Sequence, residues 1–131
     1  MWISDIESSV FTRLKAGGNK LKGQFPKLFY TTSNESDGEA VFPTVYLEEL
    51  SGSEQGADLE RVKVNSMLIS FQINVTHNGS KEETRRVMDN ALETMKKLRF
   101  EINVTPFYVR NNKIWTGTAR CRRFFDANDV W

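Results

Sequence analysis

Few side chains in this sequence could do acid–base, nucleophilic or metal chemistry. The 131 residues include one histidine, His77, and one cysteine, Cys121. A tetrahedral zinc site takes four ligands, mostly nitrogen or sulfur, so this count argues against one. His77 stands beside Asn78-Gly79, which predicts an exposed turn residue. Cys121 alternates with Gly117 and Ala119 in a strand-like pattern, which predicts a packing role in the core rather than a reactive thiolate.

The carboxylates and the glycines offer no better site. The acids gather in Gly- and Ser-rich stretches without the apolar surroundings that would raise a carboxyl pKa for general acid catalysis. The segment 15–20 (Lys-Ala-Gly-Gly-Asn-Lys) lacks the glycine and lysine spacing of a phosphate-binding loop. We therefore predict that the chain is not an enzyme and holds no cofactor or metal ion.

Two amphipathic helices are predicted, and each is preceded by a Ser-x-x-Glu capping box. Ser4 and Glu7 place the first helix at about 5–16, before Gly17-Gly18, and Ser80 and Glu83 open the second, whose apolar face continues to Leu98. The apolar stripes recur at helical spacing: Ile3, Ile6, Val10 and Leu14 in the first helix, and Val87, Met88, Ala91, Leu92, Met95 and Leu98 in the second.

Strict alternation of apolar and polar residues gives the strongest strand prediction, over 61–76. Ile69, Phe71 and Ile73 fall on one face, and Gln72 and Asn74 on the other. A sheet with one covered and one water-facing surface favours an antiparallel arrangement. Further strands are predicted at about 25–32, 44–50, 99–105, 107–110 and 114–125, with turns at 77–79 and 111–113.

This order of elements predicts an α+β fold in a single domain spanning 1–131. The long central strand and the closing hairpin should pair antiparallel. We expect two layers: a mainly antiparallel sheet of about four to five strands, with two helices packed on one face.

Charge is strongly segregated along a chain whose net charge is only +1. Residues 13–27 and 110–123 each carry five bases and no acid, whereas 33–60 carry eight acids and no base. One interpretation is that acidic and basic regions of neighbouring copies meet. The other is that these residues are simply solvated. On the first interpretation, the candidate interface residues are Glu35, Asp37, Glu48, Glu49, Arg120, Arg122 and Arg123.

A nucleic-acid-binding module is the alternative from another class. A helix, three strands and a helix are typical of a double-stranded-RNA-binding domain, which contacts the backbone through the basic start of its last helix. Here the second helix begins with mixed charges, Lys81 to Arg86, and two further strands follow it. The segment 120–125 (Arg-Cys-Arg-Arg-Phe-Phe) is the best basic and aromatic patch for phosphate contact.

The polar loops and the terminal tryptophans suggest contacts with partners. The loops at 33–41 and 51–58 are too polar to pack internally and would order on binding. Trp2 and Trp131 are candidate aromatic anchors, with packing at the core edge as the alternative. The N-terminus lacks a signal-peptide pattern, and no apolar run reaches the roughly 20 residues of a membrane-spanning helix.

The length and order of elements resemble the tail terminator proteins of long-tailed bacteriophages, also called tail completion or tail-to-head joining proteins. The resemblance covers most of the chain and is one of pattern. Four stretches carry it: Phe42-Pro43-Thr44-Val45, the alternating strand from Met67 to Val75, the helical segment from Val87 to Leu92, and the closing strand from Trp115 to Arg123.

The resemblance implies a structural protein of the virion, assembled in the host cytoplasm and located at the head-proximal end of the tail. Six copies would form a ring that caps the tail tube, stops polymerisation of the tube protein and offers a docking face to the connector of the head. Genomic DNA would pass through the channel without specific binding. We expect acidic or neutral residues to line that channel. The loop with Ser53, Glu54, Gln55 and Asp58 is the candidate contact with the tube or the lumen.

Overall fold

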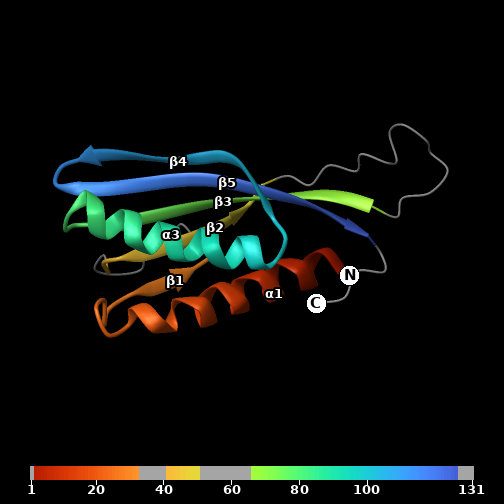
Figure 1. Cartoon of the computed structure of the whole chain (residues 1–131), viewed down its shortest axis with the longest axis horizontal. Coiled ribbons are helices and arrows are strands. Elements are labelled where there is room, and N and C mark those ends of the chain that lie inside the picture. The colour runs from red at the N-terminus through yellow and green to blue at the C-terminus, as the bar shows by residue number, and fades with distance from the viewer. Residues whose placement is uncertain (1, 33–40, 51–65, 127–131) are drawn as a thin grey trace.

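The computed structural model describes residues 2–32, 41–50 and 66–126 (Figure 1). The labels of Figure 1 are used throughout. The helices are α1 (Trp2–Gly17), the short 3₁₀ helix η1 (Gly18–Leu21) and α3 (Lys81–Lys97). The strands are β1 (Phe29–Thr31), β2 (Thr44–Glu49), β3 (Ser66–His77), β4 (Glu101–Asn111) and β5 (Ile114–Asp126).

The five strands form one sheet in the order β1-β2-β3-β5-β4. Every pairing is antiparallel except that of the three-residue β1 with β2, which is parallel. The predicted α+β fold, with its mainly antiparallel sheet and two helices, is therefore confirmed. β4 lies at one edge and β1 at the other, so the long strands β3 and β5 form the middle of the sheet (Figure 1).

Both helices pack on the same face of the sheet. Ile6 and Val10 of α1 and Met88 of α3 belong to one buried cluster with Phe71 of β3 and Cys121 of β5. This confirms the predicted apolar stripes at the described positions and the packing role of Cys121. Burial raises the pKa of the Cys121 thiol to about 12, so it does not ionise near neutral pH.

The two helices approach each other closely at the end of α1. Asn90 Nδ2 donates a hydrogen bond to the carbonyl oxygen of Gly17 at 3.1 Å. A Cβ atom at Gly17 would collide with the Thr94 hydroxyl, so the absence of a side chain allows this approach. Lys20 Nζ lies 3.7 Å from Glu93 Oε1 and adds an exposed ion pair between η1 and α3.

The second predicted helix and its capping box are confirmed. Ser80 Oγ accepts a hydrogen bond from the Glu83 backbone N–H at 3.1 Å, and Glu83 Oε1 accepts one from the Ser80 N–H at 3.2 Å. The equivalent prediction for Ser4 is wrong, because α1 begins at Trp2 and Ser4 lies inside the helix. Serine costs a helix interior only about 0.5 kcal/mol, so the pattern alone does not mark a start.

Two strand predictions also need correction. Of the predicted strand 25–32, only Phe29–Thr31 pairs with a neighbour. The predicted strands 99–105 and 107–110 are one strand, β4, whose register with β5 shifts between Ile102 and Val104 and between Val104 and Phe107. Such irregularities let a strand containing Pro106 stay at the sheet edge without being interrupted.

Candidate interaction face

The face of the sheet opposite the helices carries a connected set of polar side chains, which we call the open face. In the register of β3 and β5, Asn74 lies opposite Thr118, and Gln72 lies opposite Arg120. Asn74 Oδ1 accepts hydrogen bonds from Thr118 Oγ1 at 3.0 Å and from Gln72 Nε2 at 3.4 Å. The chain of contacts continues where Arg120 Nε donates to Gln72 Oε1 at 2.8 Å. These contacts restrict the rotamers of side chains that would otherwise be free in water.

Charges on the open face alternate in sign. Glu48 of β2 lies opposite Gln72, whose other neighbour is Arg120. Next to this row, Arg122 Nη2 lies 3.9 Å from Glu101 Oε1, with both side chains exposed. Among the described side chains of this face, two acids and two bases thus balance each other.

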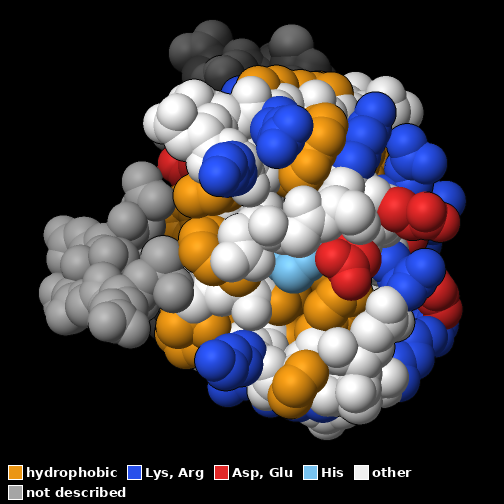
Figure 2. Space-filling model, turned by 90° about the vertical axis from the view of Figure 1, so that its left-hand side faces the viewer, with side chains coloured by type: hydrophobic (Ala, Val, Ile, Leu, Met, Phe, Trp, Pro, Cys, Tyr) orange, Lys and Arg blue, Asp and Glu red, His pale blue; other side chains and the backbone are white. Residues whose placement is uncertain are grey.

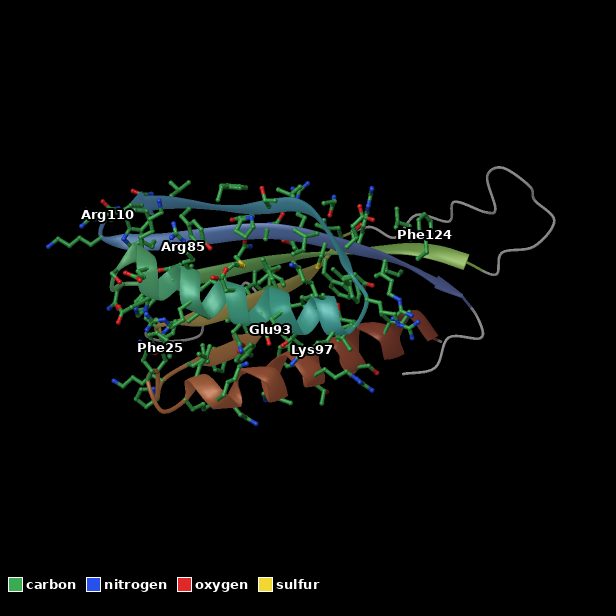
Figure 3. All side chains as sticks on the ribbon, in the orientation of Figure 1. Phe25, Arg85, Glu93, Lys97, Arg110 and Phe124 are labelled. Atoms are coloured by element: carbon green, nitrogen blue, oxygen red, sulfur yellow. The ribbon has the colours of Figure 1, made fainter. Side chains whose placement is uncertain are left out.

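Large apolar side chains flank this polar middle. Phe29 on β1, Phe107 and Val109 on β4, and Phe124 on β5 are each at least half exposed, at 50, 51, 54 and 59%. The register places them on the open face: Phe29 opposite Thr44, Phe107 opposite Thr118, Val109 opposite Thr116, and Phe124 opposite Leu68. Figure 3 shows Phe124 at the end of β5 far from Arg110. Exposed apolar side chains beside polar ones occur in protein contact surfaces, where the apolar groups usually form the centre and the polar ones the rim.

The edge strand β4 borders a groove on the helix side. The groove encloses about 720 Å³ between α3 and β4. Leu92, Ile102 and Pro106 give it apolar walls, and Asp89 and Lys96 stand among its charged residues. Because β4 pairs only with β5, its other edge has backbone groups that are free to pair with another chain.

The setting of His77 differs from the sequence-based prediction. The residue is 8% exposed, not an exposed turn residue, because β3 continues through it and directs its ring toward the covered face. His77 Nε2 lies 3.1 Å from Glu83 Oε1, and the ring meets Phe25 edge-on at 5.8 Å between centroids. The sequence contains a signal for this burial: the alternation that puts Phe71, Ile73 and Val75 on the covered face also includes residue 77.

The pair of His77 and Glu83 is part of the cap of α3. The pKa of Glu83 is lowered, first by the hydrogen bond from the Ser80 backbone and then by the hydrogen bond with His77. Ser80 Oγ accepts the backbone N–H of Glu83 as the helix cap. Within the described ranges, no three His, Cys, Asp or Glu side chains gather as metal ligands. No described helix is long and apolar enough to cross a membrane.

The structure separates the predicted interface residues into two groups. Glu48, Arg120 and Arg122 lie on the open face, as described above. Glu49 lies opposite Phe71 on the other face, where burial, and then the charge of Glu7, raise its pKa. Arg123 also faces the helix side, where its Nη1 donates to the Leu98 carbonyl oxygen at 3.0 Å. The basic run 120–123 is therefore not one patch, because neighbouring strand residues point in opposite directions.

The remaining predicted site residues lie outside what the structure describes. Trp2 begins α1, but its side chain is not among the described ones. The other residues in this group are Glu35, Asp37, Ser53, Glu54, Gln55, Asp58 and Trp131.

Comparisons with known proteins do not add a relative to this description. No model of a known protein family matches the chain, and a search of curated proteins finds no match either.

Proposed function

We propose that the chain is a structural virion protein that forms a ring at the end of a phage tail tube. In this role it stops tube polymerisation and supplies the interface for head–tail joining, with the tube protein, the neck connector and its own copies as partners. The open face is the observation that carries the proposal. It combines a preorganised polar network with exposed apolar side chains, and neither feature is needed to bury the core.

The face suits a contact between copies better than it suits a small ligand. Its hydrogen bonds join Thr118, Asn74, Gln72 and Arg120 in a row, whereas the groove between α3 and β4 lies on the helix side. A closed ring needs a heterologous contact, in which two different patches of the subunit meet. On the open face, Arg120 and Arg122 are the side chains that an acidic patch of a neighbouring copy would meet.

The resemblance in sequence pattern connects this surface to a phage tail. The strand pattern from Met67 to Val75 and the closing strand from Trp115 to Arg123 carry that resemblance. The same two segments lie in β3 and β5, the strands at the centre of the open face. The acidic region 33–60 of a neighbouring copy is the proposed counterpart of Arg120 and Arg122.

Reversing the two arginines of the open face tests the ring contact. The variant Arg120→Glu/Arg122→Glu should prevent ring formation, because it replaces two cations that face an acidic neighbour. The matched control is Lys15→Glu/Lys96→Glu, which changes net charge equally on α1 and α3, away from the open face. Sedimentation and negative-stain electron microscopy, with tube protein present, measure the assembly. Intact rings in the arginine variant would refute this contact.

Deleting the gene tests the role itself. Electron microscopy of lysates should show overlong tails separate from filled heads. Tails of normal length that fail to join heads would instead assign the chain to a neck adaptor on the head side, the closest alternative. Unchanged virions would refute both the tail terminator role and the neck adaptor role.

A further inference from the structure

The end of the molecule formed by the β4–β5 hairpin and the start of α3 carries four cationic residues and two aromatic rings. We call this group, Lys81, Arg85, Arg110 and Lys113 with Tyr108 and Trp115, the basic end. Figure 3 shows Arg110 extending beyond the hairpin and Arg85 in the nearby turns of α3. Figure 2 looks onto this side of the molecule, where Lys and Arg side chains lie among hydrophobic ones and His77, the only histidine, is near the centre.

The aromatic rings hold two of the cations in place. Lys81 Nζ lies 5.8 Å from the centroid of Trp115 and 6.0 Å from that of Tyr108. Arg85 Cζ lies 5.8 Å from the Tyr108 centroid. Contacts of this kind contribute about 0.5–1 kcal/mol at exposed sites, so they bias the side chains without neutralising them. Arg110 is the strand partner of Trp115, so the backbone register puts a third cationic residue on the same side of the sheet as that ring.

Ion pairs engage some of the cations on the described surface, but not those of the basic end. Lys20 and Lys97 both approach Glu93, and Arg122 approaches Glu101. None of the four cations of the basic end lies within 4.0 Å of a described carboxylate oxygen. Glu83 is engaged by His77 and Ser80, which leaves Glu82 and Asp89 as the acids of the neighbouring turns. The local excess is therefore positive.

We propose that the basic end binds the phosphodiester backbone of a nucleic acid without reading its sequence. Ammonium and guanidinium groups both bind phosphate oxygens, and guanidinium can do so with two parallel hydrogen bonds. A duplex presents its charges at fixed spacing on a stiff rod, so the cations can meet several phosphates without ordering the ligand. An acidic peptide must lose chain entropy to do the same. The rings of Tyr108 and Trp115 already face cations, which favours backbone contact over stacking on bases.

This site differs from the basic and aromatic segment that the sequence suggested. In the segment 120–125, Arg122 and Arg123 point to opposite faces, whereas the basic end joins residues from α3, β4 and β5. The inference does not depend on ring formation. In the proposed ring, a phosphate-binding end would slow the passage of DNA, so we place it away from the channel wall.

The test measures binding of a fluorescent 20-base-pair duplex by anisotropy between 50 and 200 mM salt. Four phosphate contacts predict a slope of log K against log salt of about −3.6, which is roughly a 150-fold loss of affinity over this range. Arg110→Gln/Lys113→Gln removes two contacts and should reduce the slope to about −1.8. The control Lys15→Gln/Lys96→Gln removes the same charge elsewhere and should keep the wild-type slope. Thermal melting establishes that each variant is folded.

Three results would overturn the proposal. The first is absence of salt-dependent binding by the wild-type protein at 50 mM salt. The second is an equal loss in both double variants, which would indicate diffuse charge and no site. The third is equally tight binding of poly-glutamate of the same charge, which would assign the basic end to an acidic protein partner. These binding measurements do not depend on the gene-deletion experiment, so an unaltered virion in that experiment would not change how they are read.

Discussion

The two faces of β3 and β5 are built from alternate residues of the same strands, yet they serve different ends. On the covered face, Phe71, Ile73 and Val75 are completely buried beneath the helices. On the open face, Gln72 and Asn74 form hydrogen bonds with β5 and remain in contact with water. The comparison teaches that the buried core and the water-facing surface are separated by a single step along the strand. Changes on one face should therefore leave the property of the other intact.

The largest expected effect is the loss of a ring from the covered face. Phe71→Ala should lower the free energy of unfolding by about 3–5 kcal/mol, because it removes buried contacts and leaves a cavity. One of these contacts is edge-on with Phe100, at 5.7 Å between centroids. Urea unfolding measures the change. The matched variant on the open face, Gln72→Ala, should cost under about 1.5 kcal/mol, and equal losses in the two variants would break the comparison.

A smaller effect is expected from adding one methyl group beneath the sheet. A Cβ atom at Gly18 would collide with the buried hydroxyl of Tyr30, whereas Gly23 has nothing within 4 Å of that position. Gly18→Ala should therefore destabilise the protein by about 1–3 kcal/mol through overpacking. Gly23→Ala is the control and should not be destabilising by this mechanism. Thermal melting compares the two, and indistinguishable variants would contradict the close packing described for Tyr30.

On the open face, the hydrogen bonds around Asn74 should contribute about 1 kcal/mol to the free energy of unfolding. Asn74→Ala removes the acceptor of two hydrogen bonds, but water can satisfy the partly exposed Thr118 and Gln72 that remain. We expect this modest loss in urea unfolding and a larger defect in assembly. A loss as large as that of Phe71→Ala would show that the open face is structural.

The smallest effect belongs to the ion pair of Arg122 and Glu101. Their side chains are 44% and 72% exposed, and the two charged atoms are 3.9 Å apart. A double-mutant cycle with Arg122→Ala and Glu101→Ala should give a coupling energy of about 0.2–1 kcal/mol that declines as salt is added. A coupling that is independent of salt would mean that the pair is held more rigidly than its exposure indicates.

Local patterns in the sequence determined the helices, the central strands and the core residues. The capping box of Ser80 and Glu83 and the stripe that begins at Val87 specify α3, because they depend only on residues a turn or two apart. Alternation in β3 likewise predicts which residues are covered. It also predicts one open face, since a polar side chain on every second residue cannot be buried at low cost. These predictions require no knowledge of which distant segments pack together.

Only the tertiary structure decided which distant residues meet. The sequence does not show that Phe25 covers His77, that β1 pairs in parallel with β2, or that Arg123 reaches the end of α3. The basic end depends in the same way on residues from α3, β4 and β5. Contacts of this kind arise because hydrophobic burial fixes the packing of whole elements, and the polar groups that they carry are then brought together.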